Sequence, residues 1–278
     1  MFGLEFPPIN AILRWKDLFP TFNKVALIAV AAALIGIVIF MLASRKDGSK
    51  APRGVRNLAE IIVEFVENQI VMPTMGREGL PWTPFMVSLF VFIYLCNVPG
   101  VIPLLQMPAT ARIAIPLCLS LLVWVVFIGV GLKRQGIKYF THLIWPPDVP
   151  TALKPLVGVI EVVSTILIRP FSHTVRLMAN MMAGHILLVT FALLSEALFQ
   201  AETNRIAFIP MGILPFFMLL FLTAFEILVA FLQAYIFTIL AAVYIGSSME
   251  GHGDDHELDH GEYGVDAESL PAAHAPAH

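Results

Sequence analysis

One long apolar segment decides the fold: residues 206–249, which read IAFIPMGILPFFMLLFLTAFEILVAFLQAYIFTILAAVYIGSSM and contain a single charged residue, Glu226. At about 1.5 Å per residue, one helix of this length would measure about 60 Å, roughly twice the hydrocarbon thickness of a bilayer. Residues 156–195 form a second segment of similar length. Ordinary helix tilts of about 20° do not absorb that excess. We therefore expect both segments to be steeply inclined, bent near Pro170, Pro210 and Pro215, or partly outside the membrane.

Three shorter apolar segments precede this pair. Residues 25–43, 85–105 and 113–132 contain no Asp, Glu, Lys or Arg, and about 20 apolar residues in a helix cross a bilayer core. The pattern predicts an all-α, polytopic membrane protein whose last two helices form a long inclined hairpin. We also expect Pro99 and Pro103 to kink the second helix. The five predicted membrane helices span 25–43, 83–105, 113–132, 155–199 and 206–248.

The composition excludes several classes of protein. The chain is 58% hydrophobic and 13% charged, whereas soluble domains average about 45–50% apolar and about 25% charged residues. It has no basic stripe that could neutralise phosphates, so nucleic acid is not expected as a partner. Cys96 and Cys118 lie in apolar segments without metal-type spacing. We interpret both as buried packing residues and predict neither a disulfide framework nor a cofactor.

Polar segments flank and interrupt the predicted membrane domain, 25–248. Residues 1–24 are expected to be retained as an outer N-terminal segment, because no signal-peptide cleavage site follows them. Residues 55–71 carry apolar residues at helical spacing on one face and glutamates on another. Two interpretations are open for this helix: it lies in the membrane interface, or it is a surface helix packed on its own protein.

The C-terminal segment, residues 249–278, is rich in histidine and acidic residues and contains HGDDHELDH at 252–260. Its composition predicts a disordered, solvated tail, with transition-metal binding as the alternative. The distribution of Lys and Arg predicts which side this tail occupies. With the N-terminus outside, inner loops hold ten of these residues and outer segments five, which places the tail in the cytoplasm.

Ionisable residues inside the last two segments are the candidate functional residues, because a charge at the bilayer centre is costly and needs a partner, a water path or a function. Arg176 and Asn180 are four residues apart and share a helix face. The small residues Ala183 and Gly184 continue that stripe and would let another helix approach closely. Antiparallel pairing would bring the last segment's polar pair, Glu226 and Gln233, toward Asn180 and His185.

A carboxylate, an imidazole and two amides in one cluster can hold water and relay protons. Arg176 cannot relay them, since arginine stays protonated, but it provides a fixed positive charge that attracts a carboxylate on a partner helix. Purely structural interpretations also remain open. Arg176 could form a salt bridge with Glu226 or Glu161, and His185 could be a hydrogen-bonded contact between helices.

Two motifs give these residues a family resemblance. Residues 169–185 read RPFSHTVRLMANMMAGH and residues 225–237 read FEILVAFLQAYIF. They resemble subunit a of F-type ATP synthases, which has the pattern R-P-x-S-x-x-x-R-L-x-x-N-x-x-x-G-[HE] in its penultimate membrane helix and x-x-x-Q-A-[FY]-[IV]-F in its last. The order and lengths of the segments agree with that family over nearly the whole chain.

The resemblance implies a role for each residue of the motifs. Arg176 would be the essential arginine that faces a ring of c subunits and keeps two proton half-channels electrically separate. The half-channel open to the outside would be lined by Asn180, His185, Glu226 and Gln233. Position 185 is acidic and position 226 histidine in some members of the family. The exchange seen here keeps one imidazole and one carboxylate.

Glu161 and Ser164 resemble the polar residues of the cytoplasmic half-channel, although Glu161 stands one residue further from Arg169 than in the family pattern. The resemblance further implies a non-catalytic stator subunit in a bacterial inner membrane, with the c ring, the b subunits of the peripheral stalk and other synthase subunits as partners. A proton-collecting role for the tail is a further hypothesis.

Two other functions remain open. An ion-coupled secondary transporter usually has duplicated halves, which we do not find, and a membrane scaffold would leave Arg176 without a purpose.

Overall fold

The computed structural model describes residues 24–44, 54–102, 108–136, 139, 144–145, 153–199 and 205–249. Within these ranges the secondary structure is helical and contains no strand, which confirms the predicted all-α class. Five of the helical stretches are long and apolar enough to cross a membrane. The predicted multi-pass membrane architecture is therefore confirmed. The N-terminal segment to residue 23 and the histidine-rich tail lie outside the described residues.

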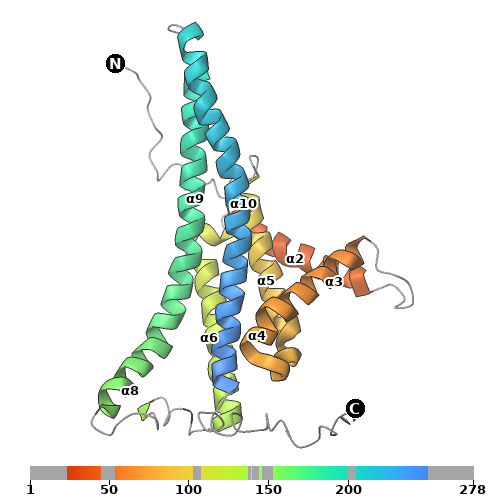
Figure 1. The fold of residues 1–278 in the computed structure, drawn as a ribbon, viewed down its shortest axis with the longest axis vertical. Helices are drawn as coiled ribbons and strands as arrows, with labels where there is room; N and C mark the ends of the chain where they lie inside the picture. Colours follow the sequence, from red (N-terminus) through yellow and green to blue (C-terminus); the bar gives the residue numbers. More distant parts are fainter. Residues whose placement is uncertain are drawn as a thin grey trace, which may run out of the picture.

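The helices follow one another along the chain as α-helices joined by short π and 3-10 turns (Figure 1). In chain order they are α2 (Lys24–Ser44), α3 (Val55–Val66), the π turn η1 (Glu67–Val71), α4 (Met72–Met75), the 3-10 turn η2 (Gly76–Trp82), α5 (Thr83–Asn97), η3 (Val98–Gly100), η4 (Ala109–Ala111), α6 (Ala114–Gln135), α8 (Lys154–Val163), the π turn η5 (Ser164–Ile168), α9 (Arg169–Phe199) and α10 (Arg205–Met249).

The long hairpin consists of α9 and α10, which run side by side along the longest axis of the molecule (Figure 1). α10 is helical throughout its length, Pro210 and Pro215 included. In the other arm of the hairpin, the π turn η5 ends two residues before Pro170, and Figure 1 shows that α8 below it is inclined to the axis of α9. A π turn in front of a proline is a recognised cause of a helix bend.

The second membrane helix differs from the prediction. α5 ends at Asn97 and continues as the short 3-10 turn Val98–Gly100, so Pro99 terminates the helix instead of kinking it. Proline has no N–H to donate and its ring clashes with the preceding turn. The Asn97 side chain accepts a hydrogen bond from Thr110 in η4, which ties the end of α5 to the start of the next hairpin arm. Pro103 lies outside the described residues.

The amphipathic segment packs on its own protein. Its α-helix ends at Val66, and residues 67–71 form the π turn η1. The ring of Phe65 lies 5.8 Å from that of Phe90 on α5 and 5.7 Å from that of Phe231 on α10, measured between ring centroids. Val66 and Ile70 are fully buried in the main core. Of the two interpretations of this helix, the structure shows the contact with its own chain.

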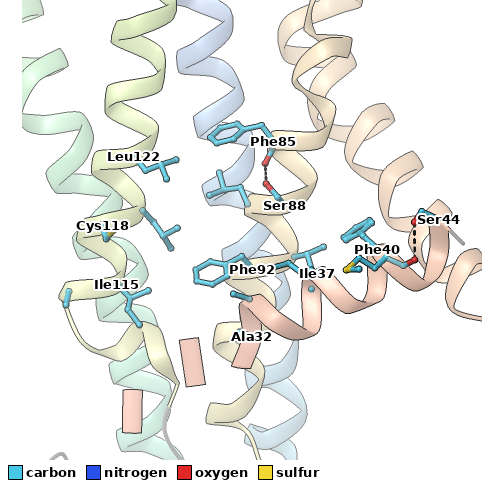
Figure 2. Close-up of a pocket in the computed structure, with 17 residues that line it drawn as sticks. Ala32, Ile37, Phe40, Ser44, Phe85, Ser88, Phe92, Ile115, Cys118 and Leu122 are labelled. Carbon is cyan, nitrogen blue, oxygen red and sulfur yellow. Dashed lines mark hydrogen bonds between the residues drawn. The ribbon is translucent and has the colours of Figure 1, made fainter. Parts of the chain in front are cut away.

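An apolar groove of about 910 Å³ is lined by α2, α5 and α6 (Figure 2). Its two serine hydroxyls bond within their own helices, Ser44 to the Met41 carbonyl at 3.0 Å and Ser88 to the Phe85 carbonyl at 2.7 Å. Cys118 lines this groove and is exposed, so its predicted burial is wrong, whereas Cys96 is buried as predicted. A membrane helix exposes apolar residues to its surroundings, so hydropathy alone does not identify its core.

Gly246 allows α10 to approach the backbone of α4. A Cβ atom at this position would lie 2.8 Å from the Thr74 carbonyl oxygen and 3.3 Å from Met75 Cγ. Overpacking of this kind costs about 1–3 kcal/mol, which exceeds the gain of about 1 kcal/mol from replacing Gly by Ala in a helix. We therefore expect Gly246→Ala to lower the apparent melting temperature of the purified protein in detergent.

Gly129→Ala is the matched control, because a Cβ at Gly129 of α6 would meet nothing within 4 Å. This variant should keep or raise the melting temperature. Equal shifts in the two variants would show that the approach of α10 to α4 is not a tight constraint.

Candidate functional site

The predicted polar residues of the last two segments meet along the seam between α9 and α10. The Asn180 amide donates a hydrogen bond to Gln233 Oε1 at 2.7 Å. Gln233 is buried with 1% of its surface exposed, so this bond fixes the amide pair inside the seam. The antiparallel pairing expected from the seven-residue spacing of Glu226 and Gln233 is therefore present, with Gln233 opposite Asn180.

Further along the seam, about one turn from Asn180 on α9 and two turns from Gln233 on α10, the Glu226 carboxylate lies against the backbone of Gly184. A Cβ atom added at Gly184 would overlap both carboxylate oxygens of Glu226. Glu226 is nevertheless buried, with 7% of its surface exposed. Glycine at position 184 therefore provides the space in which a carboxylate from α10 enters the helix interface.

His185 is buried at the next position of α9. No hydrogen bond among the described residues joins it to Glu226 or Asn180, so the structure places it beside the seam without a direct bond to these two side chains. Three of the four residues predicted for the outer half-channel, Asn180, Glu226 and Gln233, are thus linked through α9–α10 contacts, and the fourth adjoins them. Together we call Asn180, His185, Glu226 and Gln233 the outer cluster.

Arg176 has a different environment. It lies on an exposed stripe of α9 that also contains Asn180, Ala183 and Leu187, while its neighbour Leu177 is fully buried. None of the ion pairs between described residues includes Arg176. The structural interpretation in which Arg176 pairs with Glu226 or Glu161 is therefore not what the structure shows. An arginine on an apolar helix needs a partner, a water path or a function.

The residues predicted for the inner half-channel lie in the two elements that directly precede α9. Glu161 is on α8 and forms an ion pair with Arg169, with 3.2 Å between Oε1 and Nη2. Ser164 is the first residue of the π turn that follows. The Arg169 guanidinium also lies over the ring of Tyr244, with its Cζ 4.9 Å from the ring centroid.

Sequence reasoning missed this second arginine site. Arg169 and His173 were visible as ionisable residues, but no spacing rule connects them to Tyr244 on α10 or to Phe127 on α6. Only the packing of three helices brings these aromatic rings to the guanidinium. No group of three or more His, Cys, Asp or Glu residues with metal-site geometry occurs among the described residues, and the possible metal-binding run of the tail lies outside them.

The contact between Gly184 and Glu226 can be tested by a matched pair of variants. Gly184→Ala should lower the apparent melting temperature of the purified protein, because the new methyl group occupies the space of the carboxylate. Glu226→Asp shortens the acid by one methylene, so the double variant should be less destabilised than the sum of the single variants. Ala183→Ser on the exposed stripe is the control and should change little. Simple additivity of the two changes would contradict the contact.

Comparison with known proteins is consistent with the geometry. The model of the family described as ATP synthase A chain matches residues 25–246. An ATP synthase subunit a from Frankia alni is 41% identical over 256 residues, covering 91% of this chain and 83% of the relative. Proteins of the same name from Parafrankia sp. and Rhodopseudomonas palustris are 38% and 40% identical, covering 92% and 78% of this chain and 86% and 85% of the relatives. The chain belongs to the ATP synthase A chain family.

Proposed function

We propose that this chain is the stator subunit a of an F-type ATP synthase and that it provides two offset proton half-channels to a rotating ring of c subunits. The observation that carries the proposal is a contrast along the α9–α10 hairpin: Arg176 is exposed and unpaired within the described chain, while His185, Glu226 and Gln233 of the outer cluster are buried, and Gln233 accepts a hydrogen bond from the exposed Asn180. The alternative of an ion-coupled secondary transporter loses its support, because the relatives carry the name ATP synthase subunit a.

The outer cluster is the inlet in this proposal. A proton from outside passes along Glu226, His185 and the amides of Asn180 and Gln233 to a carboxylate on a c subunit. The carboxylate and the imidazole exchange protons, while the amides hold water and order it. Support comes from the Asn180–Gln233 hydrogen bond at 2.7 Å and from the burial of Glu226 against Gly184, which together line the seam with polar groups where an apolar helix pair would have none.

Arg176 separates the two half-channels. Its charge is permanent, so an ionised carboxylate on the ring is held near it and a proton cannot pass through it. Once protonated, the ring carboxylate is neutral and can turn into lipid, because burial of a neutral acid in lipid is far less costly than burial of a charge. After nearly a full rotation the carboxylate meets Arg176 from the other side and releases its proton to the inner half-channel.

Glu161 and Ser164 belong to this inner half-channel, which opens to the cytoplasm. The chain itself makes and breaks no covalent bonds other than those to exchanging protons, and ATP forms elsewhere in the complex. Beyond the c ring, the proposed partners are the b subunits of the peripheral stalk and the remaining synthase subunits. The proposed location is a bacterial inner membrane, with residues 1–24 outside and residues 249–278 in the cytoplasm.

The role of Arg176 predicts a specific defect. In inverted membrane vesicles that carry the assembled complex, Arg176→Ala should abolish ATP-driven proton pumping, because no fixed charge holds the ring carboxylate. It should also raise the passive proton leak, since the two half-channels are no longer separated. Arg77→Ala is the control, because Arg77 is an exposed arginine outside the site. Normal coupled pumping by Arg176→Ala, with the complex intact, would refute this assignment.

The proposed orientation can be tested by labelling single cysteines. In a background with Cys96→Ser and Cys118→Ser, Ala272→Cys in the tail should react with a membrane-impermeant maleimide in inverted vesicles and be protected in intact spheroplasts. Thr21→Cys, near the N-terminus, should show the opposite pattern. Labelling of both cysteines from the same side would contradict an odd number of membrane crossings.

A further inference from the structure

The π turn between α8 and α9 brings Glu161 and Arg169 to the same side of the helix. These residues are eight positions apart, which in a regular α-helix at 3.6 residues per turn places them about 80° out of phase. A π turn contains one more residue than an α turn. Because η5 at Ser164–Ile168 takes in one extra residue, the eight residues from Glu161 to Arg169 rotate the chain only as far as about seven residues of a regular α-helix would. That rotation is close to two full turns. The observed ion pair, 3.2 Å between Nη2 and Oε1, depends on this phase.

The π turn itself is held in place by α6. The indole Nε1 of Trp124 donates a hydrogen bond to the backbone carbonyl of Thr165 at 3.1 Å. Thr165 is fully buried and lies within the π turn. A widened turn leaves backbone groups that need partners, and Trp124 supplies one from a neighbouring helix. The position of the extra residue is therefore fixed by tertiary contact as well as by local sequence.

The Arg169 guanidinium is held on its other sides by aromatic rings. Its Cζ lies 4.9 Å from the centroid of Tyr244 and 5.9 Å from that of Phe127, distances at which a cation is attracted to the ring face. The His173 ring supports Tyr244 at 5.3 Å and Phe237 at 4.8 Å. Side chains of α6 and α10 thus flank the Arg169 guanidinium, whereas Arg176, seven residues later, is exposed and unpaired among the described residues.

We propose that Arg169 is a positioning residue for Glu161, and that the π turn Ser164–Ile168 exists to keep this pair in register. The guanidinium is immobilised by Tyr244 and Phe127 and offers one N–H to the carboxylate. Glu161 is thereby held in a single place on the partly exposed side of α8, where it accepts the proton that leaves the ring. This inference rests on the inner half-channel of the proposed function and assigns it a second arginine with a task different from that of Arg176.

Three side-chain variants test the positioning role in inverted vesicles that carry the complete complex. Glu161→Gln should slow ATP-driven pumping, and Arg169→Gln should slow it by at least about tenfold, because a misplaced proton acceptor transfers poorly. Arg169→Lys keeps the charge and should recover most of the rate. The double variant should be no slower than Glu161→Gln alone. Unlike Arg176→Ala, none of these variants should raise the passive leak.

The outcomes separate the two proposals. Normal pumping by Glu161→Gln would remove Glu161 from the inner path and so overturn that part of the proposed function together with this inference. A slow Glu161→Gln with a normal Arg169→Gln would leave the inner path standing and overturn the positioning role. Losses that add in the double variant, with a matching fall in assembled complex, would make Arg169 a purely structural residue.

The register itself can be tested without removing either charged group. Deletion of Ile166 from the π turn leaves seven steps, which a regular α-helix accommodates with Glu161 and Arg169 still in phase, so pumping should stay within about twofold of the parent. Insertion of one alanine after Ile166 adds a residue that the turn cannot absorb and should abolish pumping. Loss of pumping by the deletion variant, in an assembled complex, would show that the π turn does not serve to keep Glu161 and Arg169 in phase. The deletion and insertion variants also decide this question if the Arg169→Gln complex fails to assemble.

Discussion

The close approach of α9 and α10 is the constraint on which the rest of the molecule depends. Lipid provides no water to solvate a polar side chain, so each polar group of the hairpin must find a partner in protein. The seam provides an amide–amide bond between Asn180 and Gln233 and space over Gly184 for the Glu226 carboxylate. Gln233 Nε2 is buried without a hydrogen-bond partner among the described residues. A bulkier residue at position 184 would push α9 and α10 apart beside their polar side chains.

Beside this seam, the two arginines of α9 have different environments. Arg169 has an acidic partner and two aromatic rings within this chain, whereas Arg176 has an open face. The two arginines are seven residues apart, close to two full turns, so they lie on nearly the same face of α9 and differ in their position along it. Arg169 is level with the rings of Phe127 and Tyr244, whereas Arg176, two turns further on, is exposed. Arg176 has no acidic partner among the described residues, and in the proposed function a ring carboxylate supplies one.

Much of this architecture could be predicted from hydropathy and spacing. Apolar segments gave the helix positions, and the four- and seven-residue spacings placed Asn180 opposite the last helix. Other features depend on contacts that no local pattern encodes. The end of α5 before Pro99, the exposure of Cys118, the π turn and the stacking of Arg169 on Tyr244 each require knowledge of which helix lies alongside. Predictions from residue spacing also depend on a uniform period of 3.6 residues per turn, which does not hold at a π turn such as Ser164–Ile168.

The contact between Gly184 and Glu226 has a consequence for how such sequences diverge. Because the carboxylate occupies the volume that a side chain at position 184 would fill, the two positions share one space on opposite helices. Glutamate and histidine are similar in size, so an exchange of acid and imidazole between positions 185 and 226 moves charge without demanding new volume. Substitution of the glycine has no such freedom. Among related sequences, we therefore expect a larger side chain at position 184 to be accompanied by a smaller one at position 226. The acid and the imidazole, in contrast, can exchange between positions 185 and 226.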